Sequence, residues 1–373
     1  MNRAAESWTP ARRAAVIRPA ARRPAGRTGG RGPAFAAALA AAVAAAVAAA
    51  AVAVSCAPAP PLVGLFLYER ADPYIEEFAR QIEEEARGGL SVVAFDAGNS
   101  QLIQNEQLLA FLAKRPAAVM LNPVDRLASY ALARRLKEAG VPVVFFNREP
   151  LARDLEIWER SYYVGARAEQ SGQMQAELAM TLFGGDPARL NRRDRDGDGV
   201  IQLLILKGEQ GHQDAELRTK ALLDSFAAAG YEVEVLAIEV ANWKHDEAYE
   251  KIGPLARAHG GRVELIASNN DAMALGAISR LRQLGYFKDD NRDGSLDGRD
   301  ASWLPVLGID GLKEAQDSIR EGYLYGTVKN DSLSMARAMV RLAAALVGPE
   351  PSPSRPLAER YIWIDYQPFS AAD

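Results

Sequence analysis

From residue 61 onward, short apolar runs alternate with longer stretches in which apolar residues recur every three or four positions. Leu62–Tyr68 and Val141–Phe146 have the length and composition of buried strands, whereas Tyr74–Arg87 and Ala272–Leu284 have the spacing of amphipathic helices. The other predicted strands are Leu90–Phe95, Ala117–Leu121, Ile201–Leu206, Glu232–Ala237, Val263–Ala267, Val306–Ile309 and Gly322–Val328. The other predicted helices are Glu106–Ala113, Leu127–Ala139 and Glu216–Ala229. This alternation predicts an α/β fold, and 373 residues are enough for two lobes, each a doubly wound parallel sheet.

The first 55 residues differ from the rest of the chain. Residues 1–33 contain eight arginines and one acid, and residues 34–54 are almost entirely Ala and Val. This order is typical of an export signal, and Cys56 directly after it resembles the acylated residue of a bacterial lipoprotein. We predict that residues 1–55 are cleaved, that Cys56 carries the lipid anchor and that 56–60 form a linker. A retained membrane helix is the alternative.

Removal of the predicted signal makes the chain strongly acidic. The formal net charge changes from −4 to −11, because eight arginines and one acid are lost. An acidic, exported protein is a poor partner for nucleic acid, which argues against a transcription regulator. Cys56 is the single cysteine, so no disulfide can form within the mature chain.

Polar residues follow several of the predicted strands. They are Asn147, His212, Asn270, Asp310 and Asn330. Ligands of open parallel sheets bind at the carboxyl ends of the strands, so these residues together predict a binding site. Any one of them alone could instead be a helix cap.

Two acidic loops have the alternate-position spacing of calcium ligands. In the first, oxygen ligands would come from Asp194, Asp196, Asp198, Val200 and Gln202. Its twelfth position is Ile205 instead of the usual bidentate glutamate, so this loop is incomplete by itself. In the second loop the ligands would be Asp289, Asn291, Asp293, Ser295, Asp297 and Asp300. A solvated acidic turn is the alternative for each.

Four segments, Val143–Pro150, Tyr162–Gly165, Leu206–His212 and Asn269–Ala274, resemble the periplasmic glucose/galactose-binding proteins of the type I periplasmic fold. The resemblance implies two lobes joined by three crossing segments near Gly165-Ala166, Lys329-Asn330 and Ile364-Asp365. The N-terminal lobe would comprise residues 61–165 and 331–363, and the C-terminal lobe 166–330 and 364–373.

The same resemblance implies which residues contact the sugar. They are Asp72, Tyr74, Asn147, His212, Asp214, Arg218, Trp243, Asn270, Asp310 and Asn330. Planar polar side chains can bridge neighbouring hydroxyls, and aromatic rings can cover the C–H faces of a sugar. Tyr74 replaces the phenylalanine usual in that family, and Gln213 replaces a proline. The resemblance also implies that Glu264 completes the first calcium loop.

These patterns together predict a lipid-anchored, extracytoplasmic, monomeric protein that binds D-glucose and/or D-galactose and is stabilised by calcium. The resemblance implies hinge closure around the sugar, delivery to an ABC permease and, in some relatives, presentation to a chemotaxis receptor. We expect no enzymatic activity, because the sequence has no recognisable nucleophile–base motif, phosphate loop or zinc cluster. The alternatives are a secreted glycoside hydrolase, using Asp214 with Asp72 or Asp310, and a membrane-anchored sugar-sensing ectodomain.

Overall fold

The structure, a computed structural model, describes residues 59–348 and 357–370. The predicted export signal and lipidated Cys56 lie outside the described residues, so both remain predictions. Among the described helices, none is sufficiently long and apolar to cross a membrane.

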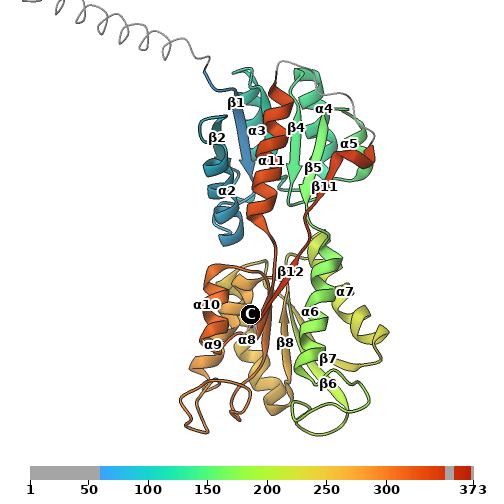
Figure 1. The fold of residues 1–373 in the computed structure, drawn as a ribbon, viewed down its shortest axis with the longest axis vertical. Coiled ribbons are helices and arrows are strands. Elements are labelled where there is room, and N and C mark those ends of the chain that lie inside the picture. Colours follow the sequence, from blue (N-terminus) through green and yellow to red (C-terminus); the bar gives the residue numbers. More distant parts are fainter. Residues whose placement is uncertain (1–58, 349–356, 371–373) are drawn as a thin grey trace, which may run out of the picture. The chain divides into compact units, whose positions relative to one another are not determined.

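The first of two six-stranded sheets is built mainly from the N-terminal half of the described chain (Figure 1). Its strands are β1 (Leu62–Leu67), β2 (Ser91–Asp96), β3 (Ala118–Leu121), β4 (Val143–Phe146), β5 (Ser161–Gly165) and β11 (Tyr361–Trp363). They lie in the order β11-β5-β4-β3-β1-β2, and every neighbouring pair is parallel. This arrangement is the doubly wound sheet predicted from the alternating pattern.

The second sheet repeats the first with one difference. Its strands are β6 (Val200–Lys207), β7 (Glu232–Val240), β8 (Leu265–Ser268), β9 (Val306–Asp310), β10 (Gly326–Lys329) and β12 (Gln367–Ser370). They lie in the order β12-β10-β9-β8-β6-β7, and the edge strand β12 is antiparallel to β10. Two parallel-dominated sheets confirm the predicted fold class.

Helices cover the faces of both sheets (Figure 1). Those associated with the first sheet are α2 (Pro73–Glu85), α3 (Gln101–Leu112), α4 (Ser129–Ala139), α5 (Ala152–Glu156) and α11 (Ser332–Val347). Those associated with the second are α6 (Ala168–Leu182), α7 (Gln213–Ala228), α8 (His245–His259), α9 (Asp271–Gln283) and α10 (Lys313–Arg320). Short 3-10 turns are η1 (Arg126–Ala128), η2 (Gly260–Arg262) and η3 (Leu357–Arg360).

The chain passes between the two sheets three times. It does so between β5 and α6, between β10 and α11, and between β11 and β12. Helix α11 packs on α2 of the first lobe although it follows a strand of the second. Residues distant in sequence are therefore brought together where the two lobes meet.

The central strands are buried on both faces, which explains their continuous apolar sequences. In β6, seven of eight residues are buried, and all residues of β3, β4, β8 and β9 are buried. Two predicted boundaries were wrong by four residues or more: the helix expected from Glu106 begins at Gln101, and the strand expected from Gly322 begins at Gly326. Gly322 has φ +83° and ends the turn after α10, so it cannot extend the strand.

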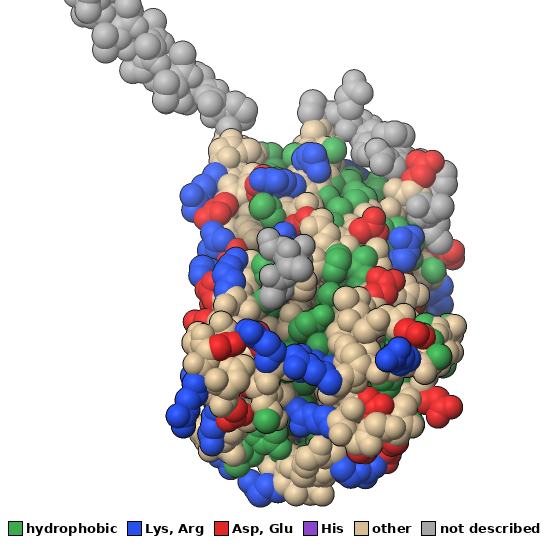
Figure 2. Space-filling model, turned by 60° about the horizontal axis from the view of Figure 1, so that its bottom comes forward, with side chains coloured by type: hydrophobic (Ala, Val, Ile, Leu, Met, Phe, Trp, Pro, Cys, Tyr) green, Lys and Arg blue, Asp and Glu red, His purple; other side chains and the backbone are tan. Residues whose placement is uncertain are grey.

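The molecular surface carries charges of both signs. Figure 2 shows basic and acidic side chains interspersed on the face turned forward. Many belong to local helical pairs, such as Arg80 with Glu84 at 2.7 Å on α2. Exposed pairs of this kind contribute about 0–1 kcal/mol each to stability. Burial of the apolar sheets therefore supplies most of the stability of the fold.

Candidate functional site

One cavity lies where the carboxyl ends of strands from both sheets meet. Its lining is polar or aromatic throughout and consists of Tyr68, Asp72, Tyr74, Asn147, Arg148, His212, Asp214, Arg218, Trp243, Asn270, Asp310 and Asn330. The structure thus brings all ten predicted sugar-contacting residues to one place. Their contacts with a sugar stay a prediction. The free space is about 30 Å³, enough for one or two waters, so a larger ligand requires the walls to move.

Helix N-termini position three of the lining residues. Asp72 caps α2 by accepting hydrogen bonds from the amides of Tyr74 and Ile75, at 2.9 and 3.3 Å. His212 caps α7, and Asn270 caps α9 by accepting from the Met273 amide at 3.0 Å. The capping role considered from the sequence is therefore real, and the same residues also line the cavity.

Left-handed backbone conformations place two further lining residues. Asn147 (φ +59°) and Trp243 (φ +67°) both adopt a region that non-glycine residues rarely occupy. Gly208 makes room for the indole, because a Cβ there would lie 2.3 Å from carbons of Trp243. Local strain of this kind, repeated at one cavity, is typical of a functional site.

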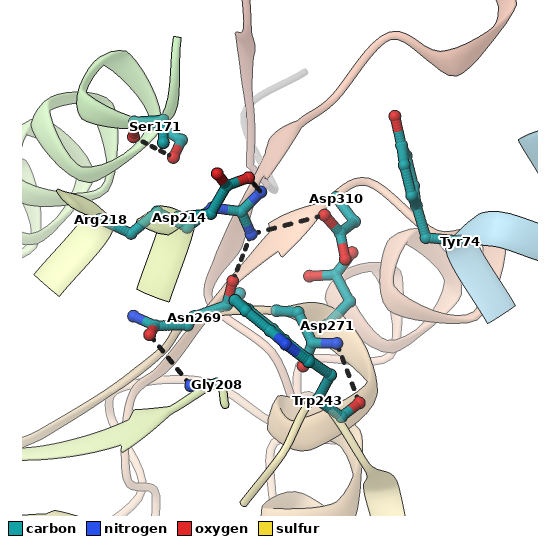
Figure 3. A network of polar contacts seen from close by, with 12 residues as sticks. Tyr74, Ser171, Gly208, Asp214, Arg218, Trp243, Asn269, Asp271 and Asp310 are labelled. Carbon is teal, nitrogen blue, oxygen red and sulfur yellow. Dashed lines mark hydrogen bonds and ion pairs between the residues drawn. The ribbon is translucent and has the colours of Figure 1, made fainter. Parts of the chain in front are cut away.

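Arg218 is the cation at the centre of this network (Figure 3). It is 5% exposed, and its guanidinium lies 3.7 Å from a carboxylate oxygen of Asp214 and 3.7 Å from one of Asp310. It also donates to the carbonyl of Asn269 at 2.6 Å and to the hydroxyl of Tyr366 at 3.1 Å. These bonds fix the guanidinium plane between two carboxylates from different elements.

The two carboxylates beside Arg218 retain unused acceptor capacity. Within the described residues, neither Asp214 nor Asp310 accepts a hydrogen bond through its side chain from the protein. Burial raises the pKa of both carboxyls, and the positive charge of Arg218 opposes that shift. Hydroxyl groups of a ligand could supply the missing donors to these oxygens.

His212 presents a neutral imidazole to the cavity. Burial lowers its pKa well below the usual value, and the nearby charges of Arg148 and Arg218 lower it further. Its Nδ1 accepts a hydrogen bond from the Asp214 amide at 3.1 Å, so the neutral ring carries its proton on Nε2. The ring packs edge to face against Trp243, with centroids 5.2 Å apart. His212 can therefore donate one hydrogen bond without carrying charge.

Tyr68 and Arg148 line the cavity but were not among the predicted site residues. The guanidinium of Arg148 lies 4.0 Å from the ring centre of Tyr68 and donates to the carbonyl of Val124. Arg148 follows Asn147 within the motif Val143–Pro150, and this position was the sequence signal that could have identified it as a site residue. Tyr68 looked like the end of an apolar strand and gave none.

Two direct contacts join the lobes beside this cavity. Arg148 lies 3.2 Å from a carboxylate oxygen of Glu209, and Gln213 donates to Glu149 at 2.9 Å. Arg148 and Glu149 follow β4 of the first sheet, whereas Glu209 and Gln213 follow β6 of the second. Both contacts lie on one rim of the cavity.

The first acidic loop contains a group of carboxylates suited to a metal. Oxygens of Asp194, Asp196 and Glu264 lie within 4.8 Å of one another. Burial raises the pKa of Glu264 to about 7, and the charges of Asp194 and Asp196 contribute. The Oε1 atom of Gln202 is buried and has no hydrogen-bond partner in the described chain. Three carboxylates and an unpaired amide oxygen form a donor set that fits calcium.

The second acidic loop differs in its electrostatics. Arg299 pairs with Asp293 at 2.9 Å and with Asp297 at 2.8 Å. Asp300, 4% exposed, accepts hydrogen bonds from the amides of Asp290 and Asn291. Several of the predicted ligands thus already have partners, and calcium binding by this loop stays a prediction.

Sequence comparisons place this chain among proteins that bind small solutes. The profile of the periplasmic binding protein domain matches residues 63–350. The D-galactose/methyl-galactoside binding periplasmic protein MglB of Haemophilus influenzae is 35% identical over 284 residues, covering 75% of this chain and 80% of that protein. A xylitol-binding protein of Mycolicibacterium smegmatis is 25% identical and covers 76% of this chain and 72% of its own.

Solved structures with the same fold are more distant in sequence. A solute-binding protein of Bacillus halodurans with bound myo-inositol superimposes with a TM-score of 0.68 at 21% identity, covering 84% of this chain and 95% of that one. A periplasmic solute-binding protein of Actinobacillus succinogenes with bound D-allose has a TM-score of 0.68 at 19% identity, covering 84% and 98%. At these identities the similarity establishes the fold alone.

Proposed function

Because the chain belongs to the periplasmic binding protein family, we propose that it captures D-galactose and/or D-glucose outside the cytoplasm and delivers the sugar to an ABC permease. The family consists of binding proteins, so the prediction that this chain is not an enzyme is confirmed. The MglB relative, named for D-galactose and methyl-galactoside, supports the choice of a hexose.

The observation that carries the proposal is that several polar atoms of the cavity residues have no hydrogen-bond partner. The buried Nε of Arg218 and Oδ1 of Asn330 have no hydrogen-bond partner in the described chain, and the carboxylates of Asp214 and Asp310 have spare acceptor sites. Hydroxyls both donate and accept, so a ring bearing several of them can satisfy all these groups. An analogue lacking one hydroxyl would leave a buried group unpaired, at a cost of about 1–3 kcal/mol.

The aromatic residues of the cavity complement the apolar faces of a hexose. Trp243 comes from the second lobe and Tyr74 from the first, and Tyr74 is only 7% exposed. The Tyr74 hydroxyl lies 3.8 Å from the sulfur of Met335, which directs this polar group toward α11. Binding between the two lobes would couple sugar capture to lobe closure, which a permease can recognise.

Calcium at the first acidic loop is part of the proposal. Asp194, Asp196, Asp198, Gln202, Glu264 and the carbonyl of Val200 would hold it. An ion here would relieve repulsion among the clustered carboxylates and tie the loop before β6 to β8, next to Glu264. Its role would be structural, because the loop lies at the opposite end of β6 from His212, about 25 Å away for an eight-residue strand.

Titration calorimetry of the mature chain with D-galactose, D-glucose and D-ribose tests the proposed ligand. We expect tight binding of at least one of the two hexoses, and a change of tryptophan fluorescence that is lost in Trp243→Phe. Trp243 is expected to report because it lines the cavity, whereas Trp303 packs in the core of the second lobe, and Trp303→Phe is the matched control. Heat with D-ribose but with neither hexose would contradict the specificity.

The depressed pKa of His212 predicts a pH dependence of stability. In the unfolded chain His212 is protonated below a pH of about 6.5, whereas in the folded protein its lowered pKa keeps it neutral over the same range. The unfolded state therefore binds more protons at acidic pH. Stability should therefore fall as the pH drops from 7.5 to 5.5, by about 1 kcal/mol from this residue. Urea unfolding of the wild type and His212→Gln at both pH values measures the difference. An equal loss in the two proteins would contradict the assignment to His212.

A further inference from the structure

A second cavity adjoins the cavity around Arg218 and Trp243, the sugar pocket. Arg148, His212 and Asp214 line both, so the two spaces adjoin at these side chains. The second cavity has about 220 Å³ of free space, compared with about 30 Å³ in the sugar pocket. Its remaining walls come from both lobes and include Arg126, Glu149, Glu209, Gln210 and Gln213. A ligand larger than one sugar ring could therefore extend in this direction.

The walls of the second cavity also contain unsatisfied polar atoms. Gln213 donates through Nε2 to Glu149, but its Oε1 is buried without a partner. The Nε atom of Arg148 is likewise buried and unpaired within the described residues. Buried polar atoms are nearly always satisfied, so an acceptor and a donor without partners beside one cavity are available to a hydroxylated group once their side chains turn toward it.

The charges around the second cavity favour a neutral ligand. Four acidic residues line it, against the two cations Arg126 and Arg148, and Arg148 is already paired with Glu209 at 3.2 Å. The excess of negative charge disfavours phosphorylated or uronic-acid ligands. The side-chain amides of Gln210 and Gln213 and the carboxylates here instead suit neutral hydroxyls, as in the sugar pocket.

We infer that the protein binds disaccharides, with one sugar ring in the sugar pocket and the second in the adjoining cavity. The inference rests on the proposed function, because the first ring must occupy the sugar pocket. Gln213 is the specificity-determining residue of the second subsite. It is the first residue of α7, a position at which proline is well tolerated, so its amide side chain is not required to form the helix.

Calorimetry with D-galactose, methyl β-D-galactoside, lactose and melibiose tests the inference. The two disaccharides present a second hexose on different ring positions and with different anomeric linkages. We expect at least one of them to bind within about tenfold of the preferred free hexose. Gln213→Ala should weaken that disaccharide about fivefold more than the free hexose, because loss of the Gln213–Glu149 contact between the lobes affects both ligands, whereas the open Oε1 serves only the second ring.

Two further variants sharpen the test. Gln210 is exposed at the cavity wall, and Gln210→Trp should fill the space and weaken the disaccharide more than tenfold while sparing the free hexose. Gln173→Ala, an exposed glutamine on α6, is the matched control and should change neither affinity. Circular dichroism and urea unfolding verify that each variant is folded.

The possible results distinguish failure of the second subsite from failure of the proposed function. Tight binding of a free hexose with both disaccharides weaker by a thousandfold would overturn the second subsite alone. Disaccharide binding that is unaffected by Gln213→Ala and Gln210→Trp would also overturn it, because the second unit would lie elsewhere. Absence of binding by every hexose and glycoside would overturn the proposed function itself.

Discussion

Replacing Arg218 by methionine is expected to abolish high-affinity sugar binding and to destabilise the protein. The change removes the only cation within 4 Å of Asp214 and Asp310 in the described chain and leaves the half-buried Asp214 and the buried Asp310 carboxylates without compensation. Loss of one partner from a buried ion pair typically costs about 3–5 kcal/mol of stability. The lost donors should weaken sugar binding by about 2–5 kcal/mol, or about 30-fold to 4000-fold.

Calorimetry at a temperature where the variant is folded, together with urea unfolding, separates the two effects. Arg218→Lys should be intermediate, because an ammonium retains the charge but cannot contact Asn269, Tyr366 and a ligand in one plane. Arg320→Met is the matched control: among the described residues this exposed arginine pairs only with Asp317 on the surface of α10, and its loss should cost less than about 1 kcal/mol. A folded Arg218→Met protein that binds the sugar within threefold of wild type would refute the role assigned to Arg218.

Removing calcium should produce the second large effect, on stability and not on sugar affinity. At a calcium concentration about 1000-fold above the dissociation constant, bound ion stabilises a protein by about 4 kcal/mol, equivalent to about 10 °C in Tm for a chain of this size. Melting in calcium and in EDTA measures this difference. Glu264→Gln should remove it, because this 2%-exposed carboxylate is the proposed ligand that would join β8 to the loop before β6.

The metal-free state offers a sharper criterion. Without calcium, Glu264 is buried beside Asp194 and Asp196, and Glu264→Gln removes that repulsion. In EDTA the variant should therefore melt no lower than the wild type, although it melts lower in calcium. Glu232→Gln, at an exposed position starting β7, is the control and should keep the full calcium effect. Identical melting of the wild type in calcium and EDTA would exclude a structural ion at this loop.

The candidate site was largely accessible from the sequence because of where its residues lie along the chain. Asn147, Asn270 and Asp310 each follow or end a strong apolar run, and the doubly wound fold brings such positions to one edge of each sheet. Tyr68 ends a similar run but looks like a core residue. Its role as the ring beneath Arg148 appears only when the loops after β1 and β4 are placed side by side.

The two acidic loops show that residue spacing alone is a poor guide to calcium binding. Spacing made the second loop the more regular calcium motif, but spacing carries no information on competing partners. Arg299 lies within the same loop and pairs with two of its carboxylates. Conversely, the first loop lacks a twelfth ligand in its own sequence, and Glu264 reaches it only because β8 is hydrogen-bonded beside β6.

The sequence by itself determined the fold class, nine of the twelve described strands and five of the ten described α-helices, because hydrophobic periodicity reflects burial that each segment requires locally. Through the family resemblance it also determined which polar residues would gather at the strand ends. Only the tertiary structure decided how those residues are electrostatically balanced. Arg218 lies between carboxylates from α7 and β9, and Gln213 meets Glu149 from the other lobe. Such pairings depend on distances between separate elements, and no local pattern in a chain specifies them.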